Sequence, residues 1–214
     1  MEPQAEPTPP RHCDVLVIGG GPAGSTVAPL LAEMGYQVVV LDKARHPRFH
    51  IGESLLPANL PLFERLGVGD EVRAIGMQKW GAEFVSPHHD HKQAFHFAEA
   101  WDKSMPYAYQ VKRAEFDTVL IRNAARKGVA VHEGCKVRAV DFLPDGALIH
   151  AVHDDGSEEE WQARFVVDAS GRDTFLANRF RIKQRNPRHN SSAVYGHFKD
   201  ARHFASWFGL TPRE

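Results

Sequence analysis

A glycine-rich segment carries the clearest chemistry in the sequence: Gly19-Gly-Gly21-Pro-Ala-Gly24 directly follows the apolar residues 13–18. Glycines at these spacings allow a tight turn, let the backbone approach a pyrophosphate, and let the following helix pack closely on a strand. The N-terminus of that helix offers N–H groups to phosphate. Asp42 lies 18 residues beyond Gly24, after the next apolar run, where a carboxylate can bind ribose hydroxyls. A strand, a helix and an acid in this order predict a dinucleotide-binding site.

The elements that would position these residues are predicted from apolar periodicity. Residues 13–18 and 37–41 have the short, β-branched pattern of buried strands, and residues 22–35 between them have the pattern of a helix. Such a βαβ unit favours a parallel sheet of the Rossmann type. Residues 113–127 have the spacing of an amphipathic helix, and a helical stretch at 53–66 is interrupted by two prolines.

Other segments predict antiparallel strands. Two Asp-containing turns link three of them into a meander from about residue 137 to residue 167, and two more predict a partial second sheet. The predicted strands outside the βαβ unit cover residues 129–131, 136–142, 147–152, 160–167, 80–86 and 93–98. The predicted fold class is therefore α/β, with an antiparallel meander beside a Rossmann-type sheet.

The composition excludes several classes of protein. Of the 214 residues, 43% are hydrophobic and 25% are charged, as in a globular protein. The net charge of −1 argues against a general nucleic-acid binder, and no apolar run approaches the ~18 residues of a membrane span. Residues 1–12 are rich in proline, lack the apolar core of a signal peptide and predict a disordered tail. Cys13 and Cys135 match no disulfide framework or metal-ligand spacing, which predicts a reducing, cytoplasmic location.

Beyond these patterns, the sequence resembles a known family. Six segments, in similar order and spacing, resemble the N-terminal half of flavin-dependent halogenases (tryptophan-halogenase-like), in the FAD-dependent monooxygenase superfamily. The segments are Gly19-Gly-Gly-Pro-Ala-Gly24, Leu41-Asp-Lys43, Gly52-Glu-Ser-Leu-Leu-Pro57, Lys79-Trp-Gly-Ala-Glu-Phe84, Tyr109-Gln-Val-Lys-Arg-Ala-Glu-Phe-Asp117 and Val167-Asp-Ala-Ser-Gly171. The resemblance implies a FAD-binding domain over residues 13–190, with an insertion of substrate-side strands at about 79–111. Residues 191–214 would begin a truncated substrate domain.

The resemblance also implies roles for individual residues in binding FAD. The glycine-rich turn would bind the pyrophosphate, Asp42 the AMP ribose, and Arg113 the phosphates or the ribityl chain. Residues 52–54 would form a strap along the flavin, and Val137 would contact the adenine through its backbone. Asp168 follows a predicted strand, where hydrogen bonds can fix its carboxylate near the cofactor. The full implied FAD-binding set is Gly19, Gly21, Pro22, Ala23, Gly24, Asp42, Lys43, Gly52, Glu53, Ser54, Arg113, Val137 and Asp168.

Lys79 is the residue to which the resemblance assigns a catalytic role. In the halogenases a lysine in the Lys-x-Gly-Ala segment guides hypochlorous acid or carries it as a chloramine. A lysine suits both roles, because its amine donates a hydrogen bond and, when partly desolvated, is a nucleophile. The residue types alone leave alternatives: Lys79 and Arg113 could be exposed surface side chains, and Glu53 with Ser54 could cap a helix.

The implied function is halogenation of an aromatic or other electron-rich small molecule, with O2, chloride or bromide, and FADH2 from a separate flavin reductase. Three alternatives stay open: a flavin monooxygenase, a geranylgeranyl-reductase-like oxidoreductase, and a truncated FAD-binding remnant without catalytic activity. The later Gly-Asp-Ala and Trp-x-Trp-x-Ile-Pro segments of complete halogenases do not occur in these 214 residues. The histidine-rich residues 88–91 predict a solvated hairpin loop and no metal site.

Overall fold

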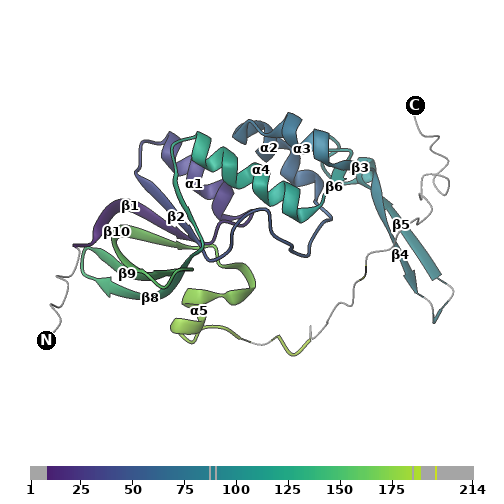
Figure 1. The fold of residues 1–214 in the computed structure, drawn as a ribbon. Coiled ribbons are helices and arrows are strands. Elements are labelled where there is room, and N and C mark those ends of the chain that lie inside the picture. Colours follow the sequence, from purple (N-terminus) through teal and green to yellow (C-terminus); the bar gives the residue numbers. More distant parts are fainter. Residues whose placement is uncertain (1–8, 87, 90, 185, 189–195, 197–214) are drawn as a thin grey trace, which may run out of the picture.

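A six-stranded mixed sheet forms the centre of the computed structural model, which describes residues 9–86, 88–89, 91–184, 186–188 and 196 (Figure 1). The strand order is β7-β2-β1-β10-β9-β8; the neighbours from β7 to β10 are parallel, whereas β10, β9 and β8 are antiparallel. The strands are β1 (Arg11–Ile18), β2 (Val38–Asp42), β7 (Ala130–Glu133), β8 (Cys135–Leu143), β9 (Gly146–His153) and β10 (Glu158–Asp168). The predicted α/β fold with its meander is confirmed.

Helices and two small sheets surround this sheet in the described part of the chain. The helices are α1 (Gly24–Glu33), α2 (Leu60–Leu66), α3 (Gly69–Ile75), α4 (Arg113–Arg126) and α5 (Phe175–Arg179). The small sheets pair β3 (Met77–Lys79) with β6 (Ala108–Gln110), and β4 (Gly81–Ser86) with β5 (His91–His96). The β4–β5 hairpin lies at the opposite end of the molecule from the six-stranded sheet (Figure 1), and it confirms the hairpin predicted around residues 88–91.

The central strands are buried on both faces, which explains their unbroken apolar sequences. On one face, Val17 and Val40 pack with Ala28 of α1 and Ala124 of α4. The alternate residues of the same strands, such as Leu16, pack in the core beneath the meander. Figure 1 shows α1 and α4 on one side of the parallel strands and β8 and β9 on the other.

Strand β10 joins the two halves of the sheet. Its residues 158–163 pair with β9, and residues 161–168 pair with β1 in parallel. Asp168 therefore ends β10 directly beside Ile18, the last residue of β1. Because β1, β2 and β10 are parallel, their carboxyl ends meet at one edge, the usual position of a nucleotide site in such sheets.

The disordered tail predicted over residues 1–12 extends too far toward β1. Strand β1 begins at Arg11, whose neighbour in register is Trp161 of β10. The guanidinium of Arg11 lies 5.6 Å from the centre of the Trp161 ring and 3.1 Å from the carboxylate of Glu159. These partners are distant in sequence, so the local pattern did not reveal them. The segment predicted to begin a substrate domain, 191–214, lies outside the described residues, apart from residue 196.

The helix predicted over residues 53–66 begins later than expected. Residues 53–55 are extended along β6: the N–H of Leu55 donates to the carbonyl of Tyr109, and the N–H of Val111 donates to that of Glu53. The chain turns helical only at Pro57, and α2 follows from Leu60. Cross-strand hydrogen bonds thus override the local helical pattern, and Glu53 and Ser54 are not helix caps.

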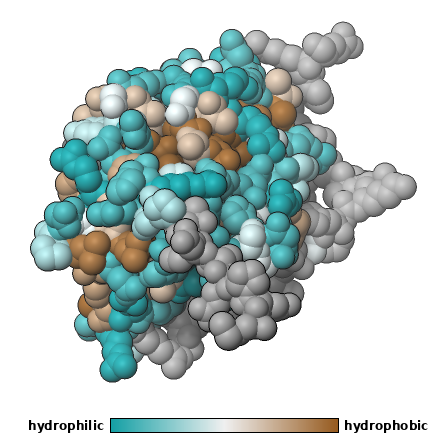
Figure 2. All heavy atoms as spheres, turned by 60° about the vertical axis from the view of Figure 1, so that its left-hand side comes forward, coloured by the Kyte–Doolittle hydropathy of each residue, from teal (hydrophilic) through white to brown (hydrophobic). Residues whose placement is uncertain are grey.

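The molecular surface shown in Figure 2 is mostly hydrophilic, with apolar side chains gathered in a patch near the top of that view. Within the described residues, no helix combines the length and the apolar composition needed to cross a bilayer.

Candidate functional site

Three glycines of the turn after β1, Gly19, Gly20 and Gly24, are closely packed, whereas Gly21 is the most open. A Cβ on Gly24 would lie under 3 Å from the carbonyl oxygen of Gly19, closer than real Cβ atoms approach. Gly19 itself has a φ of +103°, and a Cβ there would lie 2.6 Å from the carbonyl oxygen of Ala169. A Cβ on Gly21, in contrast, would meet only Nη2 of Arg48, at 3.6 Å. The open side of the turn is therefore at Gly21, the place where a pyrophosphate approaches such turns.

Asp42 ends β2 beside this turn, and its carboxylate is buried. Oδ2 accepts the N–H of Gly20 at 2.7 Å, and Oδ1 accepts the N–H of Ala44 at 2.8 Å. These bonds fix the turn against the end of the second strand. An ionised carboxylate has about four acceptor positions, so Asp42 retains the capacity to accept hydroxyl groups as well.

Two arginines converge on a second buried carboxylate, that of Asp117 in α4. Nε and Nη2 of Arg113 donate to its two oxygens at 2.7 and 3.0 Å, and Nη1 of Arg48 lies 3.5 Å away. Arg48 also lies 3.9 Å from Asp42, and Arg113 donates from Nη1 to the carbonyl of Ile51 at 2.8 Å. The side chain of Arg113 is only 10% exposed, which excludes the alternative of a surface arginine. Paired hydrogen bonds fix the guanidinium group of Arg113, and that of Arg48 lies between two carboxylates.

The strap of residues 52–54 connects Arg113 to Lys79. Gly52 has a φ of +111°, and a Cβ on it would lie 2.9 Å from Nη1 of Arg113. Two residues later, Ser54 pairs with Gln110 of β6, and its hydroxyl oxygen accepts a hydrogen bond from the ammonium of Lys79. Lys79 ends β3, which also pairs with β6. Strand β6 therefore holds the strap and the lysine together.

Lys79 is half-buried and has an aromatic neighbour. Its Nζ lies 5.5 Å from the centre of the Phe97 ring, a cation–π distance. Desolvation by burial lowers the pKa of Lys79 below its ordinary value. A lowered pKa increases the fraction of neutral, nucleophilic amine. This environment differs from that of a fully solvated surface lysine.

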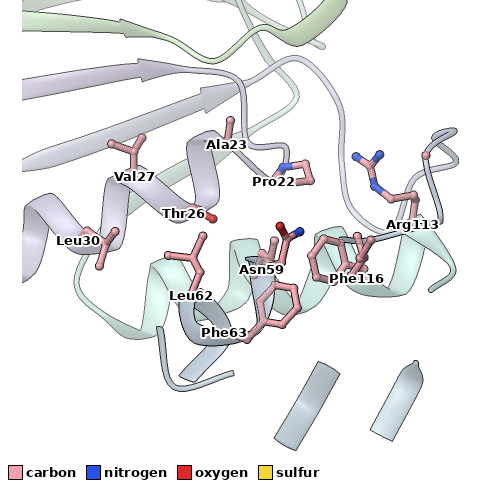
Figure 3. A pocket seen from close by; sticks show the side chains of 13 residues that line it. Pro22, Ala23, Thr26, Val27, Leu30, Asn59, Leu62, Phe63, Arg113 and Phe116 are labelled. Carbon is pink, nitrogen blue, oxygen red and sulfur yellow. The ribbon is translucent and has the colours of Figure 1, made fainter. Parts of the chain in front are cut away.

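A mostly apolar cavity of about 450 Å³ lies beside the turn, between α1, α2 and α4 (Figure 3). Its volume is within the range of small-molecule sites, about 300–1,000 Å³. Pro22 and Ala23 of the turn line it, together with Gly52 and Arg113. Apolar side chains from the three helices line the rest, among them Val27, Leu30, Leu62, Phe63, Phe116 and Leu120. Four residues predicted to bind FAD thus border one hollow, although they come from three separate segments.

Two other predicted residues hold the loop after β10. Oδ1 and Oδ2 of Asp168 accept the N–H groups of Ser170, at 3.0 Å, and Leu176, at 2.7 Å. Lys43, the residue after the end of β2, forms an ion pair with Asp173 of the same loop. The carboxylate of Asp168 is fixed by hydrogen bonds, as its position at a strand end suggested, and the loop is tied to β2.

Comparisons with known proteins agree with this geometry. A family model described as FAD binding domain matches residues 12–208. A tryptophan 2-halogenase of Chondromyces crocatus is 36% identical over 205 residues, and a flavin-dependent halogenase of Armillaria mellea is 34% identical over 204. The solved structure of a myxobacterial chondrochloren halogenase superposes with a TM-score of 0.71 at 41% identity, over 78% of this chain. The chain belongs to the FAD-dependent halogenase family.

This member of the halogenase family spans less than half the length of these relatives. The match covers 90% of the chain but 37% of the Chondromyces protein, and 92% of the chain but 40% of the Armillaria protein. It covers 39% of the chondrochloren halogenase chain. The comparison therefore concerns the FAD-binding part of a halogenase.

The site in this halogenase-family chain fits FAD in its shape and its donors. The open side at Gly21 leaves room for a pyrophosphate, and the guanidinium of Arg48 lies against the same opening. Arg48 was missed by the sequence analysis, because a single arginine in a loop has no distinguishing spacing. Val137 lies in β8 with its side chain buried in the core, so only its backbone could meet an adenine. That contact stays a prediction.

Proposed function

We propose that this chain is the FAD-binding part of a halogenase that uses FADH2, O2 and chloride or bromide to halogenate an aromatic or other electron-rich small molecule. The observation that carries the proposal is the hydrogen bond from Lys79 to Ser54, because it joins the proposed FAD-binding strap to an amine that can handle an oxidised halogen. The halogenase names of the relatives support the same reaction class. A separate flavin reductase would supply the FADH2.

FAD would be held mainly by backbone and by charged groups that the fold already fixes. Gly21 gives the pyrophosphate access to the turn, and Arg48 lies where it can offset phosphate charge. Asp42 would accept ribose hydroxyls with the acceptor positions that Gly20 and Ala44 leave open. When bound and reduced, the flavin supplies the two electrons with which O2 is activated toward halide.

Lys79 would direct the oxidised halogen. An ammonium has three donors, so the hydrogen bond to Ser54 leaves two donors that can hold hypohalous acid. Its lowered pKa also gives a second route: neutral Nζ attacks the halogen of hypohalous acid, loses a proton and releases water, which leaves a haloamine. In both routes Ser54 orients Nζ.

Flavin binding is the first test. Purified chain is titrated with FAD, and the flavin fluorescence and any bound yellow colour are measured. We expect saturable binding with one FAD per chain. A colourless protein that leaves the flavin fluorescence unchanged would refute the proposal.

Substitution of Lys79 is the second test, made in this chain and in the longest reading frame that contains it. The assay contains a flavin reductase, NADH, O2, chloride and an electron-rich aromatic trap, and chlorinated product is measured by its isotope pattern. We expect Lys79→Ala to lower chlorinated product at least a hundredfold, about 2.7 kcal/mol. FAD affinity and FADH2 oxidation should stay near wild type. Lys103→Ala, at an exposed lysine, is the matched control.

Other results of this assay would indicate a different function or a different route. Chlorination at the wild-type rate by Lys79→Ala would refute the role of the amine. Hydroxylated product formed without halide would identify a monooxygenase. Lys79→Arg separates the two routes, because arginine keeps the donors and the charge but has no nucleophilic amine. Rescue by arginine supports hydrogen-bonded hypohalous acid, and no rescue supports the haloamine.

A further inference from the structure

Three potential metal ligands meet in the meander, outside the site described above, and a fourth lies next to one of them on the edge strand β7. Cys135 begins β8 and pairs in register with His153, the last residue of β9. Sγ of Cys135 lies 3.2 Å and Nε2 of His153 lies 3.3 Å from the same oxygen, Oε1 of Glu159 on β10. The ligand atoms of these three residues all lie within 4.8 Å of one another. Nδ1 of His132, on β7, lies 3.9 Å from that oxygen.

The two shortest separations lie near the edges of a small coordination tetrahedron. With Zn–S of about 2.3 Å and Zn–N or Zn–O of about 2.0–2.1 Å, ligand atoms in a tetrahedral site stand roughly 3.3–3.6 Å apart. The distances from Glu159 to Cys135 and His153 are at or just below this range, and the distance to His132 is slightly above it. Thiolate, imidazole and carboxylate together form a borderline-soft set that suits Zn²⁺. We propose that Cys135, His153 and Glu159 bind one zinc ion, with His132 as the fourth ligand after its side chain shifts toward this cluster.

Charge and burial fit a structural rather than an open site. A thiolate and a carboxylate neutralise the two charges of Zn²⁺, which burial would otherwise make costly. Cys135 is fully buried, and the side chain of Glu159 is 9% exposed. Arg11 lies 3.1 Å from Oε2 of Glu159, so it holds the second oxygen and leaves Oε1 to the cluster. Such outer partners orient the ligands of metal sites.

Zinc would replace a proton in this cluster. In the metal-free cluster the thiol of Cys135 donates a hydrogen bond to Oε1 of Glu159, at 3.2 Å. On binding, the thiol proton passes to solvent and the S–Zn bond takes its place. The ion would connect all four strands and hold β7 to the meander. The sequence analysis predicted no metal site because these ligands come from four strands and have no characteristic spacing.

Cobalt is the probe that tests the site, because Co²⁺ bound to a thiolate gives a charge-transfer absorption in the near ultraviolet. The protein is the untagged chain with His88, His89 and His91 changed to Asn, since these exposed histidines on the distant hairpin could bind metal adventitiously. We expect one equivalent of Co²⁺ to produce the absorption and Zn²⁺ to abolish it. Zn²⁺ should also raise the thermal midpoint, since it binds only the folded chain.

Two variants locate the thiolate. The sequence has two cysteines, so Cys13→Ser should keep the absorption and Cys135→Ser should remove it. His153→Asn, at a partly exposed position, should weaken Zn²⁺ binding at least about a hundredfold and decides the question if Cys135→Ser does not fold. The proposal is overturned if the parent protein gives no thiolate absorption at one equivalent of Co²⁺. It is also overturned if the absorption survives Cys135→Ser, or if His153→Asn binds Zn²⁺ as the parent does.

Discussion

Alanine substitutions at two glycines of the same turn should have different effects, because the fold requires one glycine and FAD binding requires the other. Gly24→Ala adds a methyl group whose nearest neighbour is the backbone carbonyl of Gly19, at a distance that real Cβ atoms do not show. The carbonyl cannot rotate away as a side chain would, so α1 or the turn must shift. Overpacking of this kind costs about 1–3 kcal/mol, and the backbone clash places Gly24→Ala near 3 kcal/mol. For a protein of this size, 1 kcal/mol corresponds to about 2–4 °C, so we expect the thermal midpoint to fall by about 6–12 °C.

Gly21→Ala should give the opposite result. Its new methyl group would lie 3.6 Å from the end of the Arg48 side chain, an ordinary contact, and its φ is not in the left-handed region. We expect the thermal midpoint without FAD to stay within about 2 °C of wild type, because loss of chain entropy in the unfolded state offsets small strain. FAD affinity should fall at least tenfold, about 1.4 kcal/mol, because the methyl group occupies the approach of the pyrophosphate.

Differential scanning fluorimetry without flavin and fluorescence titration with FAD measure the two effects on the same samples. A Gly24→Ala variant with the wild-type midpoint would show that the turn and α1 are not packed as described. A Gly21→Ala variant with wild-type FAD affinity would show that the flavin does not approach this turn.

Three further substitutions test the charged groups. Asp117→Asn leaves two largely buried guanidinium groups without their buried carboxylate and should lower the free energy of unfolding by about 3–5 kcal/mol. Asp70→Asn, in an exposed ion pair, should change it by under about 1 kcal/mol, and urea unfolding measures both. Burial alone would raise the pKa of Glu133, but hydrogen bonds from His46 and Arg122 lower it below its ordinary value of 4.5. This carboxylate therefore stabilises the fold above pH 4.5 and loses that effect as the pH falls through its folded-state pKa, so Glu133→Gln should reduce the loss of stability between pH 7 and pH 3. Asp42→Ala should weaken FAD binding by about 1.5–3 kcal/mol; an unchanged dissociation constant would exclude the ribose contact.

The parts of the fold that local sequence determines were predictable. Strands β1 and β2 are short apolar runs buried on both faces, and the meander strands are joined by turn-forming residues, so periodicity and turn chemistry identify them. The small sheet of β3 and β6 was missed. Each of its strands has three residues, too few to show an alternation, and the partners are separated by most of the insertion. Residues 53–55 were assigned to a helix for the same reason, since only β6 makes them extended.

In the candidate site, too, features set by the local sequence were predictable and contacts between distant segments were not. The glycines and Asp42 were predictable because one strand–turn–helix–strand unit fixes their distances. The link between Arg48 and Arg113 was not, because Asp117 joins a loop to a helix about 65 residues later in the chain, and no spacing records that contact. His46 likewise has no visible partner in the sequence, yet both its backbone N–H and its ring contact Glu133.

Buried carboxylates connect the glycine turn to Lys79 through a continuous series of contacts. Asp42 holds the turn through Gly20, and Arg48 lies between Asp42 and Asp117. Asp117 fixes Arg113, and the strap of residues 52–54 runs from Arg113 to the hydroxyl that accepts the hydrogen bond of Lys79. The side chains of Arg48, Asp117 and Arg113 are largely buried, whereas Ser54, near the end of the series, is exposed. The glycine-rich turn and the amine of Lys79 are therefore the two ends of one series of contacts.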